Sequence, residues 1–200
     1  SWPMNWDKTM PNSYFSNPLM FLIETLFQLY MYIVAIRLLL PLIRTSFTHP
    51  LIQTIIRITE PLCAPLRSFM PSTRKFDSAV LLLLILVTLV KLTLLLSLAG
   101  AWPALIGLVL LTAAELFSLF ISLFTVTIII EVLLSWLAPQ GYNPVASLIQ
   151  AINAPLLDPV RKRMPLMGGI DLSPLVVILG LQVLSMLVMP LLLGSAYPQY

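Results

Sequence analysis

The sequence predicts an all-α, polytopic membrane protein with four transmembrane helices in two parallel repeats. Three observations support this prediction. First, 59% of the residues are hydrophobic and only 10% are charged, whereas soluble domains average about 25% charged residues. Second, four stretches are apolar over the roughly 20 residues that an α-helix needs to cross a bilayer. Third, the chain repeats itself at a fixed offset of 94 residues, and an internal repeat determines the architecture.

The repeat is clearest in its prolines, four of which recur after 94 residues. They are Pro50, Pro61, Pro65 and Pro71, matched by Pro144, Pro155, Pro159 and Pro165. We therefore predict a first repeat over 19–99 and a second over 113–193, joined by a linker or outer extension at 100–112. Residues 1–18 and 194–200 are expected to be tails. Part of the first tail is expected to come from cloning, because the chain does not begin with Met.

The four predicted spans are Leu19–Ile43, Ala79–Leu98, a stretch from Pro103 to Leu137, and Pro174–Leu193. As a single helix the third stretch would measure about 52 Å at 1.5 Å per residue, which is long for one span. The repeat offset places the copy of the first span at 113–137. We interpret 104–112 as an outer extension or a re-entrant piece, and we favour a helix continuous with the third span.

Basic residues predict the orientation. The connections 44–78 and 138–172 hold eight of the eleven lysines and arginines, while the opposite side has only Lys8. Both connections should therefore be cytoplasmic and both termini outside. The same residues are candidates for contact with anionic lipid headgroups or partner proteins. The candidates are Arg57, Arg67, Arg74, Lys75, Arg161, Lys162 and Arg163.

Each connection contains a predicted amphipathic helix. In the second copy, Val145, Leu148, Ile149 and Ile152 share one helical face. His49 and Asn143 stand at the N-cap positions, each followed by a proline at the first helical position. We expect Pro61 and Pro155 to end these helices. Such short amphipathic helices lie in the membrane interface and do not cross the bilayer.

A recurring motif of prolines and an aspartate follows each predicted amphipathic helix. Its residues are Pro61, Pro65, Pro71 and Asp77 in the first copy, and Pro155, Pro159, Pro165, Asp171, Ser173 and Pro174 in the second. Prolines four apart restrict the backbone and predict a short, rigid helical turn at the membrane surface. Ser173 is expected to cap the last span and Pro174 to open it.

These motifs resemble the YggT family of bacterial inner-membrane proteins, called YlmG in plastids and Gram-positive bacteria. The resemblance rests on Thr59–Arg67, Pro155–Arg161 and Gly168–Pro174, with Arg37 and the Ser135-Trp136 pair. It implies a bacterial inner-membrane protein without established catalytic activity. It also implies an association with osmotic and ion-stress tolerance, with cell-division gene neighbourhoods and, in plastids, with assembly of cytochrome complexes.

Five ionisable residues lie inside the predicted spans: Glu24, Arg37, Lys91, Glu115 and Glu131. A charge in a span costs ~2.5 kcal/mol or more, so these groups should pair or face water. Arg37 and Glu131 are repeat equivalents at equal depth, and we predict that they pair across a pseudo-twofold axis. Glu24 or Glu115 should neutralise Lys91. Two roles are open for these charges. The role that we favour is a set of structural pairs that fix the helix register, and the other is a polar path for an ion or proton.

The sequence contains no motif for a nucleophile, a phosphate loop or a metal. His49 and Cys63 are each the only residue of their type, which excludes bis-histidine haem ligation and an intrachain disulfide. We predict a non-enzymatic scaffold or assembly factor without a cofactor. Its expected partners are anionic lipid headgroups and other integral membrane proteins, or a second copy of the chain, but not nucleic acid. The alternative is a small transporter or channel in ion or osmotic homeostasis.

Overall fold

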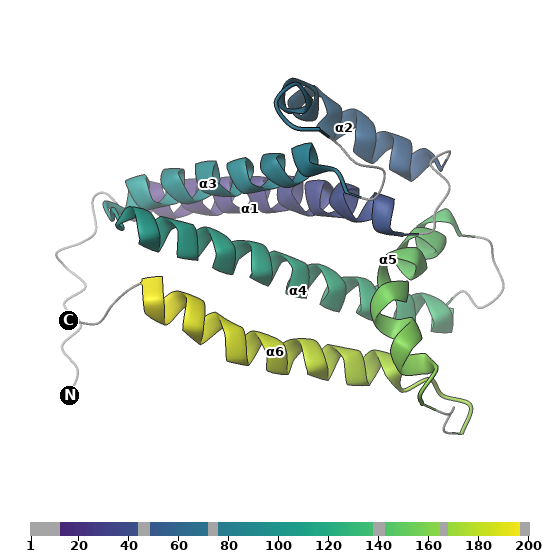
Figure 1. Ribbon diagram of the computed structural model, residues 1–200. Coiled ribbons are helices and arrows are strands. Elements are labelled where there is room, and N and C mark those ends of the chain that lie inside the picture. The colour runs from purple at the N-terminus through teal and green to yellow at the C-terminus, as the bar shows by residue number, and fades with distance from the viewer. Residues whose placement is uncertain (1–12, 44–48, 72–75, 138–142, 165–167, 197–200) are drawn as a thin grey trace, which may run out of the picture.

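The computed structural model describes residues 13–43, 49–71, 76–137, 143–164 and 168–196. Within these ranges the chain forms six α-helices and one 3-10 turn (Figure 1). The elements are α1 (Ser13–Leu39), η2 (Leu40–Leu42), α2 (Pro50–Arg67), α3 (Ser78–Ala99), α4 (Leu105–Leu137), α5 (Pro144–Arg161) and α6 (Ser173–Ala196). The predicted all-α class is confirmed.

Four of these helices are long and apolar enough to cross a membrane. The candidate spans are Pro18–Leu42, Ser78–Ala99, Leu105–Leu137 and Ser173–Gly194, so the described residues hold the four spans that hydropathy predicts. Residues 105–112 form the first turns of α4, whose helix is continuous, and they are not a re-entrant piece. α1 begins at Ser13, so the end of the expected first tail is helical.

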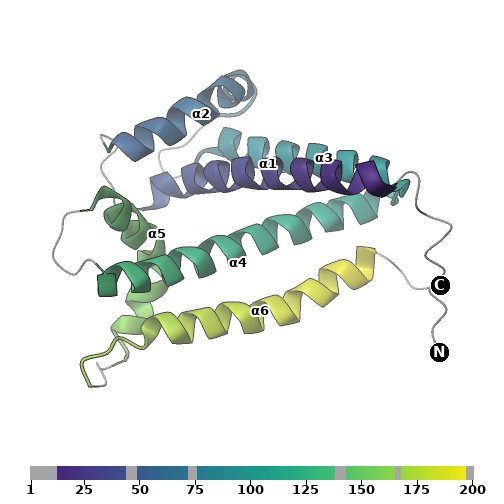
Figure 2. The same cartoon turned by 180° about the vertical axis from the view of Figure 1, so that it is seen from behind.

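The four long helices run side by side, and the two shorter ones gather at one end of them (Figures 1 and 2). We call this end the connection end, because α2 and α5 connect the spans there. α5 lies across the ends of α4 and α6, while α2 lies slanted beside α1 and α3. α1 packs on α3, α4 packs on α6, and α3 packs on α4 to join the two repeats.

The core lies mainly in and around the first repeat. Met31, Val34 and Leu84 are fully buried there and pack against Leu119 of α4. A second cluster joins the two short helices at the connection end through Ile52 of α2 and Ile152 of α5. α6 keeps most of its large apolar side chains exposed. An apolar exterior is expected for a helix whose solvent is lipid.

The structure corrects the expected ends of the amphipathic helices. Pro61 and Pro155 do not end α2 and α5, which continue to Arg67 and Arg161. A proline removes one backbone hydrogen bond and usually breaks a helix interior. Here the prolines lie on the exposed side, where water can meet the freed carbonyls. The buried side is held by tertiary contacts, and these outweigh the local preference.

The predicted helix starts are confirmed at both short helices. The Nδ1 atom of His49 accepts a hydrogen bond from the amide of Leu51 at 3.3 Å, and Oδ1 of Asn143 accepts one from Val145 at 2.9 Å. At the last span the cap differs from the prediction. Asp171 accepts from the amide of Ser173 at 2.9 Å, and the Ser173 hydroxyl is buried and donates to the same carboxylate.

Candidate functional site

At the connection end of α1, a buried arginine holds the first amphipathic helix against its span. Arg37 is only 6% exposed. Its guanidinium donates to the Glu60 carboxylate, to the Thr59 hydroxyl and, at 3.3 Å, to the carbonyl of Ile56. A buried charge is tolerated when it is paired and fully hydrogen-bonded. Arg37 therefore ties α1 to α2.

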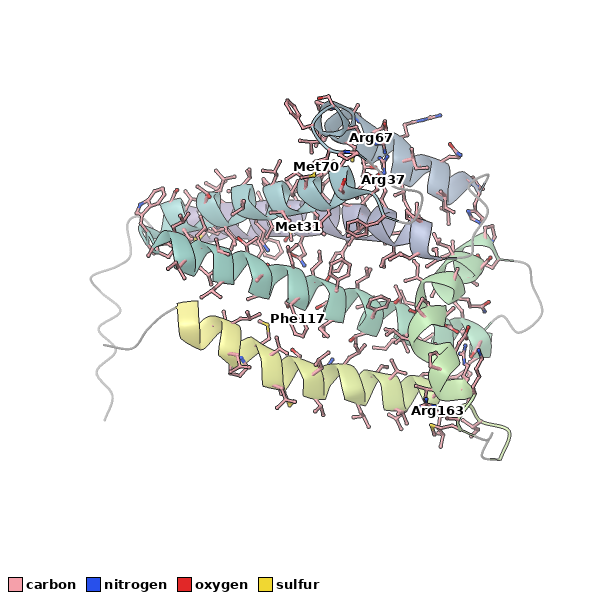
Figure 3. All side chains as sticks on the ribbon, viewed as in Figure 1. Met31, Arg37, Arg67, Met70, Phe117 and Arg163 are labelled. Carbon is pink, nitrogen blue, oxygen red and sulfur yellow. The ribbon has the colours of Figure 1, made fainter. Side chains whose placement is uncertain are left out.

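The same carboxylate links this arginine to a second one. Arg67 donates to Glu60 Oε1 at 2.9 Å and to Asp77 Oδ2 at 3.1 Å. Asp77 in turn caps α3 by accepting from the amide of Ala79 at 3.2 Å. Figure 3 places Arg37 and Arg67 together where α2 meets α1 and α3. We call Arg37, Thr59, Glu60, Arg67 and Asp77 the first-repeat cluster, in which positive and negative charges alternate.

The second repeat has an equivalent cluster with a different charge arrangement. Glu131 of α4 is 8% exposed, and its carboxylate accepts from Asn153 Nδ2 at 2.7 Å and from Arg161 Nη2 at 3.0 Å. Asn153 Oδ1 accepts from the Thr127 hydroxyl at 2.7 Å. These bonds tie α4 to α5 as Arg37 ties α1 to α2.

Arg161 is the centre of this second cluster. Its Nε atom donates to Asp171 Oδ2 at 2.8 Å, and its Nη1 atom lies 4.0 Å from Asp158 Oδ1. Burial alone would lower the pKa of Arg161, but its hydrogen bonds to Asp171 and Glu131 raise it overall. Burial likewise opposes ionisation of Asp171, but hydrogen bonds from Ser173 and Arg161 hold the pKa of that carboxyl below its usual value. We call Glu131, Asn153, Asp158, Arg161 and Asp171 the second-repeat cluster.

The structure does not form the predicted pair between Arg37 and Glu131. Each residue is bonded within its own repeat, Arg37 to Glu60 and Glu131 to Arg161. Equal depth does not bring two side chains together when a partner of opposite charge lies on the adjacent short helix. The sequence holds a signal for this outcome: where Arg37 becomes Glu131, Glu60 becomes Ala154. Losing that carboxylate leaves Arg161 to contact Glu131 directly.

A separate ion pair lies in the spans. Lys91 is only 2% exposed, and its Nζ atom donates to Glu115 Oε2 at 2.9 Å and to Gln28 Oε1 at 3.1 Å. Of the two carboxylates considered for Lys91, Glu115 is the one it contacts, while Glu24 is exposed. Sequence reasoning missed Gln28. A polar amide inside an apolar span, four residues from Glu24, was the available signal.

Of the seven basic residues predicted to contact lipid headgroups or partner proteins, two already form ion pairs within the clusters. Arg67 and Arg161 are engaged in the two clusters. Arg57, Lys162 and Arg163 are exposed. Arg74, Lys75 and Pro165 lie outside the described residues.

The described residues contain no candidate metal site, and their one cysteine is buried. No group of three His, Cys, Asp or Glu side chains there could hold a metal ion. The thiol of Cys63 is fully buried in the first-repeat core, and burial raises its pKa. A raised pKa disfavours the reactive thiolate.

Each cluster lines a cavity at the connection end. The first-repeat cavity measures about 410 Å³, and its charged walls are Arg37, Glu60, Arg67 and Asp77. The second-repeat cavity measures about 810 Å³ and is lined by residues of α4, α5 and the segment that leads into α6. The two repeats therefore carry equivalent cavities of unequal size.

A comparison with known proteins gives both a family and relatives. The family model described as CCB3/YggT matches residues 16–98 and 110–192, two segments that begin 94 residues apart. An uncharacterized protein of Pseudomonas aeruginosa is 42% identical over 170 residues, which are 84% of this chain and 86% of the relative. An uncharacterized protein of Vibrio alginolyticus is 34% identical over 83% of this chain and 90% of its own.

A further relative is the uncharacterized protein YggT of Escherichia coli K12. It is 31% identical over 170 residues, which are 85% of this chain and 88% of the relative. No solved structure matches this chain.

Proposed function

This chain belongs to the CCB3/YggT family, and we propose that this multi-pass membrane protein is a non-enzymatic scaffold or assembly factor for membrane protein complexes. Its working surface would be the connection end, where α2 and α5 are held in place by the two clusters. The resemblance to the YggT family links such a role to osmotic and ion-stress tolerance in a bacterial inner membrane.

One observation carries the proposal: the buried ionisable groups at the connection end hold the short helices to the spans. Arg37 ties α1 to α2, and Glu131 ties α4 to α5. A side chain fixed by a buried ion pair and several hydrogen bonds has little freedom to bind and release a passing ion. Such fixed pairs are suited to orienting a surface.

The spacing of the charges argues against a conduction path. Gln28, which contacts Lys91, and Arg37 lie nine residues apart on α1, about 13 Å along the helix axis. Between them, Met31, Val34 and Ala35 are fully buried and apolar. A proton or ion relay needs polar groups or water at each step. Among the described residues this interval holds no charged side chain. Its buried hydroxyls, those of Tyr30 and Thr88, do not form a chain, because Thr88 donates to the carbonyl of its own helix at Leu84 and the Tyr30 hydroxyl has no hydrogen-bond partner.

The connection end presents exposed apolar side chains beside positive charge. On and after α2, Leu62 is 49% exposed and Phe69 is 82% exposed, and Arg57 is exposed on the same helix. Aromatic and arginine side chains are enriched at protein interfaces. Together they would let α2 contact another membrane protein at headgroup level.

Site-specific photo-crosslinking tests the proposal. A photoreactive residue at Leu62 on α2 should capture reproducible integral membrane proteins in native membranes. The matched control is Leu184 on α6, which is 45% exposed and should capture lipid or no protein. Equal protein capture at Leu62 and Leu184 would contradict a docking role for the connection end. A lack of protein capture both at Leu62 and at a photoreactive residue placed at Phe69 would contradict it as well.

A further inference from the structure

The two repeats meet inside the chain through a different side of each. In the spans, Leu92 of α3 and Leu111 of α4 form a buried cluster, and Leu123 of α4 packs into the first-repeat core. At the connection end, Ile43 after η2 and Ile152 of α5 belong to one buried cluster. We call the side that the first repeat contributes, with Ile43 and Leu92, side A. Side B is the side that the second repeat contributes, with Leu123 and Ile152.

Side A of the second repeat is uncovered. The 94-residue offset gives Leu92 a counterpart in Met186 of α6. Leu92 is 8% exposed, whereas Met186 is 73% exposed. Ile43 is likewise buried, and its counterpart Leu137 at the end of α4 is exposed. The second repeat therefore presents on α4 and α6 the side that the first repeat uses for packing.

Side B of the first repeat is uncovered in the same way. Ile152 of α5 is 1% exposed, and its counterpart Ile58 of α2 is 46% exposed. Leu123 of α4 is buried, and its counterpart Leu29 of α1 is exposed. Each repeat thus uses one side of the internal interface and leaves the other side open.

The arrangement of the helices explains why these sides do not cover each other within one chain. A closed twofold would bring α6 onto α1 as α3 packs on α4. Instead, α6 packs on α4 and α5, and α4 lies between α6 and the pair of α1 and α3 in both views (Figures 1 and 2). Both short helices lie at the connection end, so the relation between the repeats preserves their orientation in a bilayer. The same relation can therefore place a second copy beside the first in one membrane.

Exposure to lipid alone does not explain the two open sides. A lipid-facing position is exposed in both repeats, as Val90 of α3 and its counterpart Leu184 of α6 are. The residues of sides A and B behave differently, since each is buried in one repeat and exposed in the other. Because the repeats share a fold, an open side presents the helix arrangement that its buried counterpart packs with.

The open sides also carry complementary side chains at the connection end. Within the chain, Leu42 and Ala151 line one cavity between the repeats. Their counterparts are Trp136 and Arg57, both of which are exposed. A contact of side A on side B between two copies brings this indole and this guanidinium together, which is a favourable cation–π pair. Trp and Arg are enriched among the residues that dominate the binding energy of interfaces.

In the spans, the open sides lack the charges of the internal interface. Lys91 and Glu115 form an ion pair between α3 and α4, and their counterparts are Ser185 and Phe21. An unpaired charge facing lipid is costly. Uncharged residues at these two positions suit surfaces that face lipid until two copies meet.

We propose that a second copy of this chain covers the open sides, with side A on α4 and α6 of one copy against side B on α1 and α2 of the next. The contact joins two different surfaces, so it is head-to-tail and leaves each end of a dimer open to a further copy. The proposal is separate from partner docking at Leu62. The counterpart of Leu62 is Leu156, which is not a member of the cluster that joins the two repeats.

Cysteine crosslinking in the membranes of expressing cells tests this contact. Ile58→Cys and Leu137→Cys are placed on separately tagged, co-expressed chains and treated with a short bismaleimide. Both residues are exposed, so neither change disturbs the core. We expect a mixed dimer from the two chains together and no dimer from either variant alone, since the two residues lie on different sides. A chain that carries both cysteines should give dimers, trimers and higher species.

Ser147→Cys replaces Leu137→Cys in the matched control. Ser147 and its counterpart Gln53 are both exposed, so this position lies outside sides A and B. A mixed dimer that is absent, or no more abundant than with Ser147→Cys, overturns the proposal. Dimers from Ile58→Cys alone would show a symmetric contact and overturn it as well.

A further variant tests the complementary pair. Trp136→Leu, which copies Leu42 of the first repeat, should lower the yield of mixed dimer roughly threefold, the scale of an exposed cation–π contact. An unchanged yield overturns the predicted contact with Arg57. Photo-crosslinking at Leu62 to proteins other than this chain reports separately on partner docking, so each proposal can fail alone.

Discussion

Arg37 and Glu131 occupy the same place in two copies of one fold and carry opposite charges. Each is buried, and each is satisfied by a partner on the short helix of its own repeat. The change of sign is matched by the loss of a carboxylate between Glu60 and Ala154. A buried charge reversal is tolerated when the neighbouring charges change with it.

Arg37→Gln should destabilise the protein because it leaves Thr59 and Glu60 without their shared donor. Losing a charged hydrogen-bond donor of this kind costs about 2 kcal/mol. Arg37→Lys should not rescue stability, since an ammonium lacks the fork that reaches several acceptors. Thermal unfolding in detergent measures both variants, and Lys162→Gln on the exposed surface serves as the control. Equal unfolding temperatures for Arg37→Gln and Lys162→Gln would contradict this role.

Asp171 predicts an acid-dependent loss of stability. Its folded pKa lies below the ordinary value of 3.8 because Ser173 and Arg161 donate to the ionised carboxylate. The stabilisation is therefore complete above that value and is lost as pH falls through the folded pKa. Unfolding temperatures between pH 7 and pH 3 should fall more steeply in the unchanged protein than in Asp171→Asn. Parallel curves would show that this carboxylate does not contribute to acid sensitivity.

At the scale of elements, the two short helices show tertiary packing overriding local preference. The prolines of α2 and α5 predict helix ends, yet both helices continue through them. Thr59 and Cys63 lie four residues apart and are both fully buried, as expected for one face of an uninterrupted helix. The exposed prolines occupy the other face.

Cysteine labelling checks this continuity. If α2 continues past Pro61, Cys63 faces the core and should not react with a maleimide until the protein is denatured, since its thiol is buried and its pKa is raised. Ser68→Cys, at an exposed position that follows α2, should react in the folded state. Rapid reaction of Cys63 in the folded protein would mean that α2 ends at Pro61.

At the scale of the whole molecule, hydropathy and the 94-residue offset predict the class, the number of spans and the two short helices. They do not predict which charged groups meet. An offset equates the depths of Arg37 and Glu131, but the lateral distance between side chains depends on how the helices pack. The positions of α2 and α5 against their spans decided that outcome, and local sequence carries little information about them.

The orientation of the whole molecule in the membrane is a prediction that rests on the distribution of its basic residues. Ser147→Cys on α5 and Trp102→Cys before α4 place thiols at exposed positions on opposite ends. A membrane-impermeant maleimide added outside intact spheroplasts should label Trp102→Cys and leave Ser147→Cys unlabelled until the membrane is broken. The buried Cys63 of the same chain supplies a low background. The reverse pattern would place the connection end outside.

Ion flux through proteoliposomes most directly tests the claim that this protein is a scaffold whose buried charges are structural. With purified protein at known density, potassium and proton flux should not exceed that of protein-free liposomes, because no charged side chain of the described residues lies between Lys91 and the connection end. Robust flux that Lys91→Ala abolishes would contradict the account and make the protein a transporter or channel.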